Sequence, residues 1–310
     1  MKVSVIVSIY NGEDVLPLTI PALLNQNYPH ESTEIILVDD ASTDETPSLL
    51  ENREWKDRAT VVRHTENRGR TATRNSGIDT ATGDLLVFVD CDIEVGPEFL
   101  SLHVEQHRNS GIVGVLSNVR PREMKSSNKY HRYLFSGRRG AKLVGENHPL
   151  PFRYFIMTCA SIKAYAVRKT GKFNEKLPGY GIDLEYAYRL WNNYPNGLFY
   201  SSGIVVFMHK AKDLHETLVD FREYGRRNVP IILSNFPELA PYVGADFVSS
   251  PPGSFSLRGL VGSLLINQVM SSLARMLLML APYPLSNHFV RYLMLSAAAM
   301  GYRESLKSRD

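Results

Sequence analysis

Cysteine is scarce in this sequence: the chain of 310 residues has two, Cys91 and Cys159, each inside an apolar stretch. Two such cysteines cannot supply the disulfide framework of a small secreted domain, and they are typical of a protein from a reducing compartment. The first residues, MKVSVIVSIYNG, alternate like a strand and lack the longer apolar core and cleavage site of a signal peptide. We therefore expect a cytoplasmic protein.

The sequence also lacks a large excess of charge of one sign, and it lacks two glycine-rich motifs that bind nucleotides. The formal net charge of +3 is too small to indicate a nucleic-acid partner, and we expect none. The turn after the first predicted strand, SIYNGED, has a single glycine rather than G-x-G-x-x-G, which argues against a nicotinamide-dependent dehydrogenase. A glycine-rich triphosphate loop near the N-terminus, which a sugar nucleotidyltransferase would need, is absent as well.

Strand-like and helical patterns alternate in the first part of the chain. We predict strands at residues 3–9, 34–38, 60–63, 84–89, 111–117 and 203–208, an extended segment at 152–163, and helices at 13–26, 70–80 and 181–191. The cluster Ser42–Glu45 is expected to cap a further helix. Four β-α repeats with short connections predict an α/β fold with a mostly parallel central sheet and helices on both faces.

The character of the chain changes to helical after about residue 213, so we predict a catalytic domain at 1–215 and a helical extension at 216–310. Two helices are expected at 257–280 and 285–302. The longest uncharged stretch of the first, between Arg258 and Arg275, falls short of the roughly 20 residues that a membrane span needs. The pair can pack on the catalytic domain, lie in a membrane interface or span the membrane, and the sequence leaves these alternatives open.

A basic segment precedes the middle of the chain. Between Arg120 and Lys142 there are eight lysines and arginines and one acid, Glu123. Such a run is either a solvated face or a landing surface for an anionic acceptor or membrane phosphate.

Acidic side chains follow the predicted strands at their carboxyl ends. Asp90 and Asp92 end the apolar run LLVFV, and strand alternation would put both on one face. Two carboxylates at close range stay ionised only if a cation compensates them, and Mg²⁺ or Mn²⁺ is the expected ion. Asp39 and Asp40 follow the second strand, where a carboxylate can bind a base or ribose edge or simply cap a helix.

Three further groups carry candidate chemistry. Tyr10, at the end of the first strand, offers a stacking face for a nucleobase. Arg68, Arg70 and Arg74 open a helix, an arrangement that favours a diphosphate. Asp183 and Glu185 lie near a helix start after a glycine-rich turn, where one carboxylate can serve as a general base toward a hydroxyl or merely cap the helix.

Taken together, five ordered motifs resemble the family 2 glycosyltransferases, which are inverting, nucleotide-sugar-dependent enzymes of the GT-A fold. The motifs are VSVIVSIYNGE, EIILVDDASTDET, ENRGRTATRNSGI, LLVFVDCDIEVGPEFL and GYGIDLEYAYRLW, and the resemblance covers about residues 1–215. With its predicted C-terminal helices, the chain resembles the bacterial and archaeal type of the family that carries a helical extension.

The resemblance implies roles for particular residues. Ser8, Tyr10 and Asp40 would hold the nucleoside, Arg74 would lie near the phosphates, and Asp90 and Asp92 would hold the diphosphate and metal. The family's Glu-Asp pair falls on Ile182-Asp183, so Asp183 is the candidate base, and His209 is a possible third metal ligand. The replacement of the first acid by Ile182 is a departure from the pattern.

The expected reaction is transfer of a sugar from a nucleotide-diphosphate donor, in the first instance a UDP-sugar, to a hydroxyl of a saccharide or lipid-linked acceptor. Peripheral contact with the inner face of the cell membrane is a further expectation. The alternative is a catalytically inactive nucleotide-sugar-binding or scaffold protein. The sequence leaves the donor sugar, the linkage and the oligomeric state open.

Overall fold

The computed structural model describes residues 1–123, 128–248, 262 and 264–307. The chain divides into two compact units. Unit 1 comprises residues 1–123, 135–175 and 182–211, and unit 2 comprises 124–134, 176–181 and 212–310. The longest segment of unit 2 begins at Lys212, and two short upstream segments belong to the same unit.

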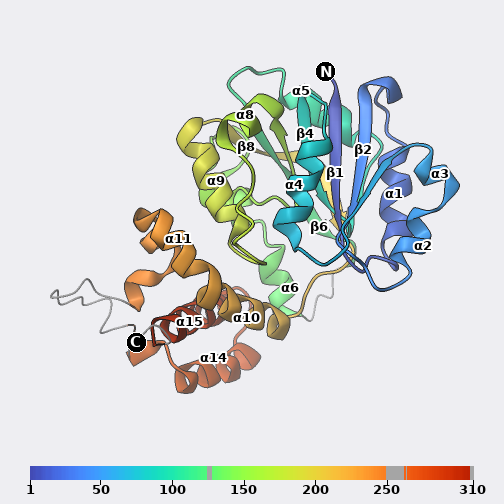
Figure 1. Cartoon of the computed structure of the whole chain (residues 1–310). Coiled ribbons are helices and arrows are strands. Elements are labelled where there is room, and N and C mark those ends of the chain that lie inside the picture. The colour runs from blue at the N-terminus through green and yellow to red at the C-terminus, as the bar shows by residue number, and fades with distance from the viewer. Residues whose placement is uncertain (124–127, 249–261, 263, 308–310) are drawn as a thin grey trace. The chain divides into compact units, whose positions relative to one another are not determined.

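Unit 1 is built on one sheet of eight strands in the order β3-β2-β1-β4-β7-β6-β8-β5. Figure 1 shows β1 between β2 and β4 in this sheet. The strands are β1 Val3–Ile9, β2 Thr33–Asp39, β3 Thr60–Arg63, β4 Leu85–Asp90, β5 Ile93–Val95, β6 Gly114–Pro121, β7 Cys159–Lys163 and β8 Leu198–Met208. Strands β3, β2, β1 and β4 are parallel, as predicted, whereas β7 runs antiparallel between β4 and β6. The edge strand β5, antiparallel to β8, was not predicted.

Helices cover the sheet of unit 1. Successive side chains of a strand point to opposite faces of the sheet, so the apolar strands offer both faces for helices to pack on. The helices are α1 Leu16–Leu24, α2 Thr46–Leu50, α3 Arg53–Lys56, α4 Arg70–Thr80, α5 Phe99–Gln106, α7 Ala141–Val144, α8 Ala164–Thr170 and α9 Ile182–Asn193. Val5, Val7 and Ile9 of β1 join the core cluster of α1. Ile6 points to the other face, where Gly77 of α4 approaches so closely that an added Cβ would lie 2.2 Å from Ile6 Cγ2.

Unit 2 consists of helices around the long helix α15. Its helices are α6 Lys129–Leu134, α10 Leu214–Glu223, α11 Val229–Asn235, α12 Ala240–Val243, α14 Gln268–Leu280 and α15 Ser286–Lys307, with a π-helical segment at Tyr224–Asn228. Glycines allow the close helix crossing: a Cβ on Gly225 would lie 1.8 Å from Ala298 O, and one on Gly301 would lie 1.9 Å from Arg222 O. Among the helices of the described residues, none has the combined length and hydropathy needed to cross a bilayer.

The predicted helix at 257–280 differs from the observed one. Residues 257–261 and Ser263 lie outside the described residues. After a bend at residues 266–267, α14 begins with Asn267 as N-cap, whose Oδ1 accepts the Met270 N–H at 2.9 Å. Asn267 thus caps the helix, and Ser271 is buried with its Oγ 3.0 Å from Ser296 Oγ of α15.

Candidate functional site

The carboxyl ends of β1, β2 and β4 meet at one edge of the sheet, as the parallel topology requires. Ser8 of β1 pairs with Val38 on one side and with Asp90 on the other, and Ile9 pairs with Asp39. Three of the predicted motifs are thus brought together by the register of the strands alone.

Asp90 and Asp92 lie close together, but not by the strand alternation that was expected. Strand β4 ends at Asp90, and Asp92 lies in the turn that leads into β5. Burial of Asp92, followed by the nearby charge of Asp90, raises the pKa of the Asp92 carboxyl to about 6. This turn therefore concentrates negative charge in a place with little solvent.

Arg74 connects the acids of two motifs. Its side chain is 2% exposed, and its guanidinium donates to Asp183 Oδ1 at 2.8 Å, to Asp90 Oδ1 at 3.3 Å and to the Met157 carbonyl at 3.1 Å. The Phe173 ring lies 5.5 Å from Arg74 Cζ. Arg74 is thus a buried cation that joins carboxylates, and its expected contact with donor phosphates stays a prediction.

Asp183 lies in the first turn of α9, directly after the turn at Gly179 and Gly181, whose φ angles are +70° and +85°. Its side chain is 26% exposed, so one carboxylate oxygen can bind Arg74 while the group still reaches solvent. Glu185, the other acid of this motif, is buried and paired with Arg189 at 2.7 Å. Of the two acids, Asp183 alone combines partial exposure with a contact to the cluster of Arg74 and Asp90.

Asp40 is held in place by donors from the loop that follows β3. His64 Nδ1 lies 2.6 Å from Asp40 Oδ1, which also accepts the Arg68 N–H at 2.9 Å, and Asp40 Oδ2 accepts the Gly69 N–H at 2.7 Å. The second imidazole nitrogen of His64 lies 2.8 Å from Ser76 Oγ on α4. Asp40 therefore fixes the loop from β3 into α4. These three donors occupy three of the four lone pairs of the Asp40 carboxylate, which leaves one on Oδ2.

His64 was missed in the sequence analysis. It directly follows the strand at 60–63, the same place in a β-α repeat that the other candidate residues occupy. That position was the signal that could have singled it out.

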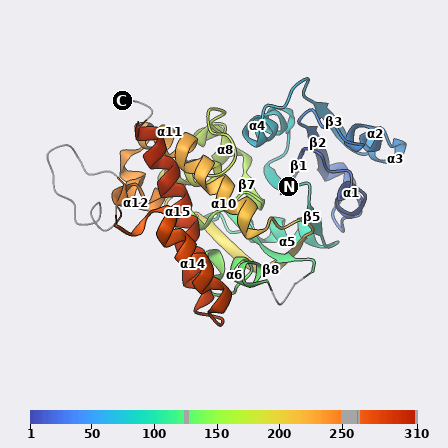
Figure 2. The same ribbon diagram turned by 90° about the horizontal axis from the view of Figure 1, so that it is seen from below.

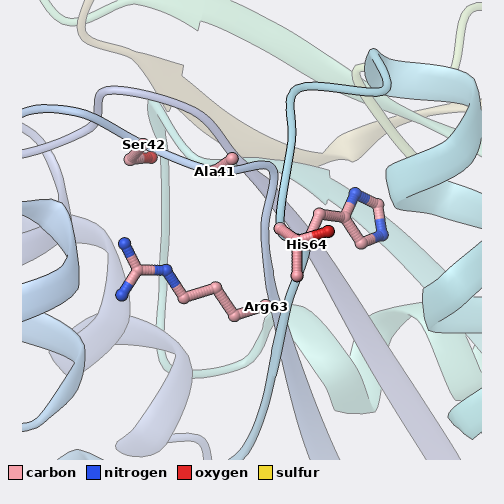
Figure 3. Close-up of a pocket in the computed structure, with 5 residues that line it drawn as sticks. Ala41, Ser42, Arg63 and His64 are labelled. Atoms are coloured by element: carbon pink, nitrogen blue, oxygen red, sulfur yellow. The ribbon is translucent and has the colours of Figure 1, made fainter.

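A hollow of about 450 Å³ opens beside Asp40, lined by Ala41, Ser42, Arg63, His64 and Thr65. Figure 3 shows the Arg63 and His64 side chains pointing in opposite directions from the end of β3. Arg63 Nε lies 3.2 Å from Asp39 Oδ2. The hollow therefore has a cationic side and an imidazole side at the carboxyl ends of β2 and β3.

Tyr10 lies at the end of β1 and is 49% exposed, so its ring is accessible for stacking. The turn after it is tied to the loop that follows Asp40: the Asn11 N–H donates to Ser42 Oγ, and Asn11 Oδ1 accepts the Thr43 N–H. Asn11 has a φ of +49°, as the predicted Asn-Gly turn favours.

His209 follows β8 directly, and its N–H donates to the Asp92 carbonyl at 2.9 Å. Its imidazole is engaged elsewhere, since Nε2 lies 2.7 Å from Glu94 Oε2. Arg122 Nε lies 3.6 Å from the same Glu94 oxygen. The backbone of His209 is thus held beside Asp92, while its side chain bonds to the edge strand β5.

The family model described as "Glycosyl transferase family 2" matches residues 4–171 of the chain. This range holds the residues just described from Ser8 to Asp92. The chain belongs to glycosyl transferase family 2. Asp183 and His209 lie beyond the matched range, so their roles depend on their contacts with the matched part.

Curated relatives of this family 2 chain include two transferases with poly(ribitol-phosphate) in their names. A poly(ribitol-phosphate) beta-glucosyltransferase of Bacillus spizizenii is 39% identical over 102 residues, which are 32% of this chain and 16% of that protein. The poly(ribitol-phosphate) beta-N-acetylglucosaminyltransferase TarS of Staphylococcus aureus is 30% identical over 131 residues, which are 41% of this chain and 23% of that protein. The chain thus spans less than a quarter of the length of either relative.

Solved structures share the fold over the whole chain. A crystal structure of S. aureus TarS has a TM-score of 0.60 at 18% identity and covers 100% of this chain and 92% of that one. The mannosyltransferase PcManGT of Pyrobaculum calidifontis, in complex with GDP-Man and Mn²⁺, has a TM-score of 0.61 at 19% identity and covers 100% and 88%. At these identities the likeness establishes the predicted fold class of the glycosyl transferase.

The side chains of the family 2 site supply some of the ligands that a divalent cation needs. Asp90 and Asp92 supply neighbouring carboxylate oxygens, the ligands that Mg²⁺ and Mn²⁺ prefer, and the buried position of Asp92 favours a compensating cation. Within the described part of the chain, no group of three or more histidine, cysteine and acidic side chains is arranged to hold a metal ion. His209 can serve as a third ligand only if its Nε2 exchanges Glu94 for the ion.

Ile182, which stands in place of the first acid of the family's Glu-Asp pair, is a buried residue. Ile182 is 2% exposed, packed as an apolar residue at the start of α9. A carboxylate buried to this extent would lose its hydration. The apolar residue therefore suits the packing of this glycosyl transferase at that position.

Proposed function

We propose that the protein is an inverting glycosyltransferase that moves a sugar from a nucleoside diphosphate, in the first instance UDP, to an acceptor hydroxyl. The observation that carries this proposal is the Arg74 bridge between Asp90, on the donor side of the site, and Asp183, the candidate base. Support for the donor class comes from TarS, whose fold this chain shares and which has been crystallised with UDP-GlcNAc.

The nucleoside is assigned to the edge formed by β1, β2 and β3. Asp40 keeps a lone pair on Oδ2 with which it can accept an N–H from the base, while His64 and two backbone amides fix the carboxylate. Tyr10 offers its exposed ring for stacking, and Ser8 lies between the second and fourth strands beside Asp90. The hollow next to Asp40 provides space for the base.

Asp90 and Asp92, with His209 after its release from Glu94, would hold Mn²⁺ or Mg²⁺ at the diphosphate. The ion supplies compensation for the negative charge of the diphosphate leaving group when it is bound. Asp183 accepts the proton of the acceptor hydroxyl as the acceptor oxygen bonds to the anomeric carbon and the bond from that carbon to the diphosphate oxygen breaks. Arg74 holds the Asp183 carboxylate at a fixed position for this transfer.

The acceptor is proposed to be a saccharide or a lipid-linked saccharide at the inner face of the cell membrane. The two relatives with poly(ribitol-phosphate) in their names act on a polyanion, which fits the basic segment between Arg120 and Lys142. Lys125 of this segment lies outside the described residues.

The test is a panel of nucleotide sugars, each measured by thermal shift and by release of the nucleoside diphosphate, with and without Mn²⁺. We expect Mn²⁺-dependent stabilisation by one donor class together with release of its diphosphate, and a product of inverted anomeric configuration. Stabilisation without release, with acceptors present, would favour the alternative of an inactive nucleotide-sugar-binding protein. Absence of stabilisation by every donor would overturn the proposal.

A further inference from the structure

Helix α14 presents an exposed apolar face in unit 2. Val269, Leu273, Met276 and Leu280 recur at spacings of four, three and four residues, which places them on one side of the helix. They are 41–77% exposed, whereas Ser271, Ala274 and Leu278 on the opposite side are buried. Figure 2 shows α14 alongside α15, onto which this buried side packs.

Further exposed apolar residues lie on α14 and beyond both of its ends. Leu264 and Leu265 precede the helix, Met279 lies in its last turn, and Tyr283 and Leu285 follow it, all of them between 38% and 73% exposed. These five residues and the four named above form what we call the α14 surface. Isolated exposed apolar residues are ordinary, but nine of them within positions 264–285, four on one face of a helix, mark an interaction site.

Cations from a distant part of the sequence surround one end of this surface. Lys129 of α6 donates from Nζ to the Leu278 and Met279 carbonyls at 2.9 and 2.6 Å, which binds α6 to the C-terminal end of α14. Arg132 of the same helix lies over the Tyr283 ring, with Cζ 4.3 Å from the ring centroid. Part of the basic segment at 120–142 is therefore folded against the C-terminal helices in unit 2.

The charge of the surrounding sequence has one sign. Between Asp246 and Glu304 the chain has no aspartate or glutamate, while Arg275 and Arg291 are exposed in this interval. Arg275 is an exposed neighbour of Met276 on α14, and Arg291 of α15 lies 5.9 Å from the Tyr133 ring of α6. An apolar surface with cations at its edge is complementary to a layer that is apolar inside and anionic outside.

We infer that the α14 surface docks on an anionic membrane. Its aliphatic side chains and Tyr283 enter the boundary between headgroups and acyl chains, and the exposed Arg132, Arg275 and Arg291 face the lipid phosphates. A second copy of the chain fits less well, because two such surfaces would bring arginines together without acidic partners. The inference deepens the proposed function by naming the surface that brings the enzyme to a lipid-linked acceptor.

The experiment is sedimentation of the full chain with vesicles of phosphatidylcholine alone and with about one third phosphatidylglycerol, in the absence of donor. We expect binding to the anionic vesicles that weakens as salt rises. The triple variant Leu273→Ser, Met276→Ser, Leu280→Ser should lose affinity by about tenfold or more, because the removed groups supply the apolar contact. Arg132→Gln with Arg275→Gln should weaken binding and reduce its dependence on salt.

A matched control changes exposed leucines of unit 1: Leu102→Ser with Leu143→Ser should bind like the unchanged chain, and far-UV circular dichroism and thermal midpoints establish that each variant is folded. Equal binding of the triple variant and the unchanged chain to anionic vesicles would overturn the inference. So would the absence of vesicle binding, or a loss of dimer in light scattering caused by the triple variant without any vesicle binding. Donor-dependent diphosphate release, measured separately, distinguishes these outcomes from failure of the transferase proposal.

Discussion

Arg74 donates a hydrogen bond of 2.8 Å to Asp183 Oδ1 across 109 positions of the sequence. The second guanidinium nitrogen reaches Asp90 Oδ1 at 3.3 Å, so a single buried cation sets the separation of the candidate base and the end of β4. Because a planar guanidinium donates in fixed directions, it orients the carboxylates as well as neutralising them.

Asp183→Asn is expected to abolish transfer and leave donor binding intact. The amide cannot accept the proton of the acceptor hydroxyl, and loss of a general base reduces turnover by about 100-fold or more. The measurement is initial-rate transfer, with thermal stabilisation by UDP and Mn²⁺ as the binding readout. Glu185→Gln on the same helix is the control: it breaks the buried pair with Arg189, so it should lower stability and leave turnover of the folded protein nearly unchanged. Near-normal transfer by Asp183→Asn would exclude Asp183 as the base.

Arg74→Gln is expected to lower the free energy of unfolding by about 3 kcal/mol, because it leaves the carboxylates of Asp90 and Asp183 without their shared cation. Arg74→Lys keeps the charge but cannot reach both acids with fixed geometry, so the loss should be smaller. Urea unfolding measures both. Arg68→Gln is the matched control, since its ion pair with Glu175 is exposed on both sides and should matter little. Wild-type stability of Arg74→Gln would contradict the bridging role.

His64→Ala is expected to weaken nucleotide binding by roughly tenfold, because Asp40 loses a charge-assisted hydrogen bond that fixes its orientation. Titration calorimetry with UDP measures the change. Ser76→Ala removes only the contact on the far side of the imidazole and should leave the affinity close to that of the unchanged chain. Should both variants bind UDP equally well, Asp40 would not depend on His64 for its position.

Much of the candidate site at the carboxyl edge of the sheet could be predicted, because the sequence patterns that indicate its strands and helices are local. The strands at 3–9 and 60–63 and the helix at 70–80 match the structure to the residue, since an apolar run or a helical period and a turn bound each one. Once these repeats are taken as parallel, Asp40 and Asp90 must lie at a common edge. The family resemblance and the fold class were confirmed for the same reason.

The rest depends on contacts between residues far apart in sequence. No local pattern indicates that β7 inserts antiparallel between β4 and β6, or that the His209 imidazole bonds to Glu94 rather than facing Asp92. The membership of α6 in unit 2 is equally non-local, because Lys129 finds its acceptors about 150 positions away.

Two buried histidines predict how stability depends on pH. His103 of α5 lies 3.0 Å from Ser117 Oγ of β6 and 2.8 Å from Ser161 Oγ of β7, and His107 lies 2.8 Å from the same Ser161 hydroxyl. Burial lowers the pKa of His103 to about 3 and that of His107 to about 4. Both stay neutral in the folded chain, whereas in the unfolded chain they take up protons near their ordinary pKa of 6.5. The stabilising contribution of the two neutral histidines is therefore fully present above about pH 6.5. It decreases as the pH falls toward 4, by on the order of 1 kcal/mol per pH unit for each histidine.

The measurement is urea unfolding between pH 7.5 and pH 4.5, in the unchanged chain and in His107→Gln. Glutamine keeps a side chain that can bond to Ser161 but takes up no proton, so the variant should lose about half of the histidine-dependent slope. The comparison between variants matters because the raised pKa of Asp92 acts in the opposite direction over part of this range. His30→Gln, at an exposed site, is the control and should leave the slope unchanged. If His107→Gln and the unchanged chain lost stability in parallel down to pH 4.5, His107 would have to be charged in the folded protein, contrary to its burial between α5 and β7.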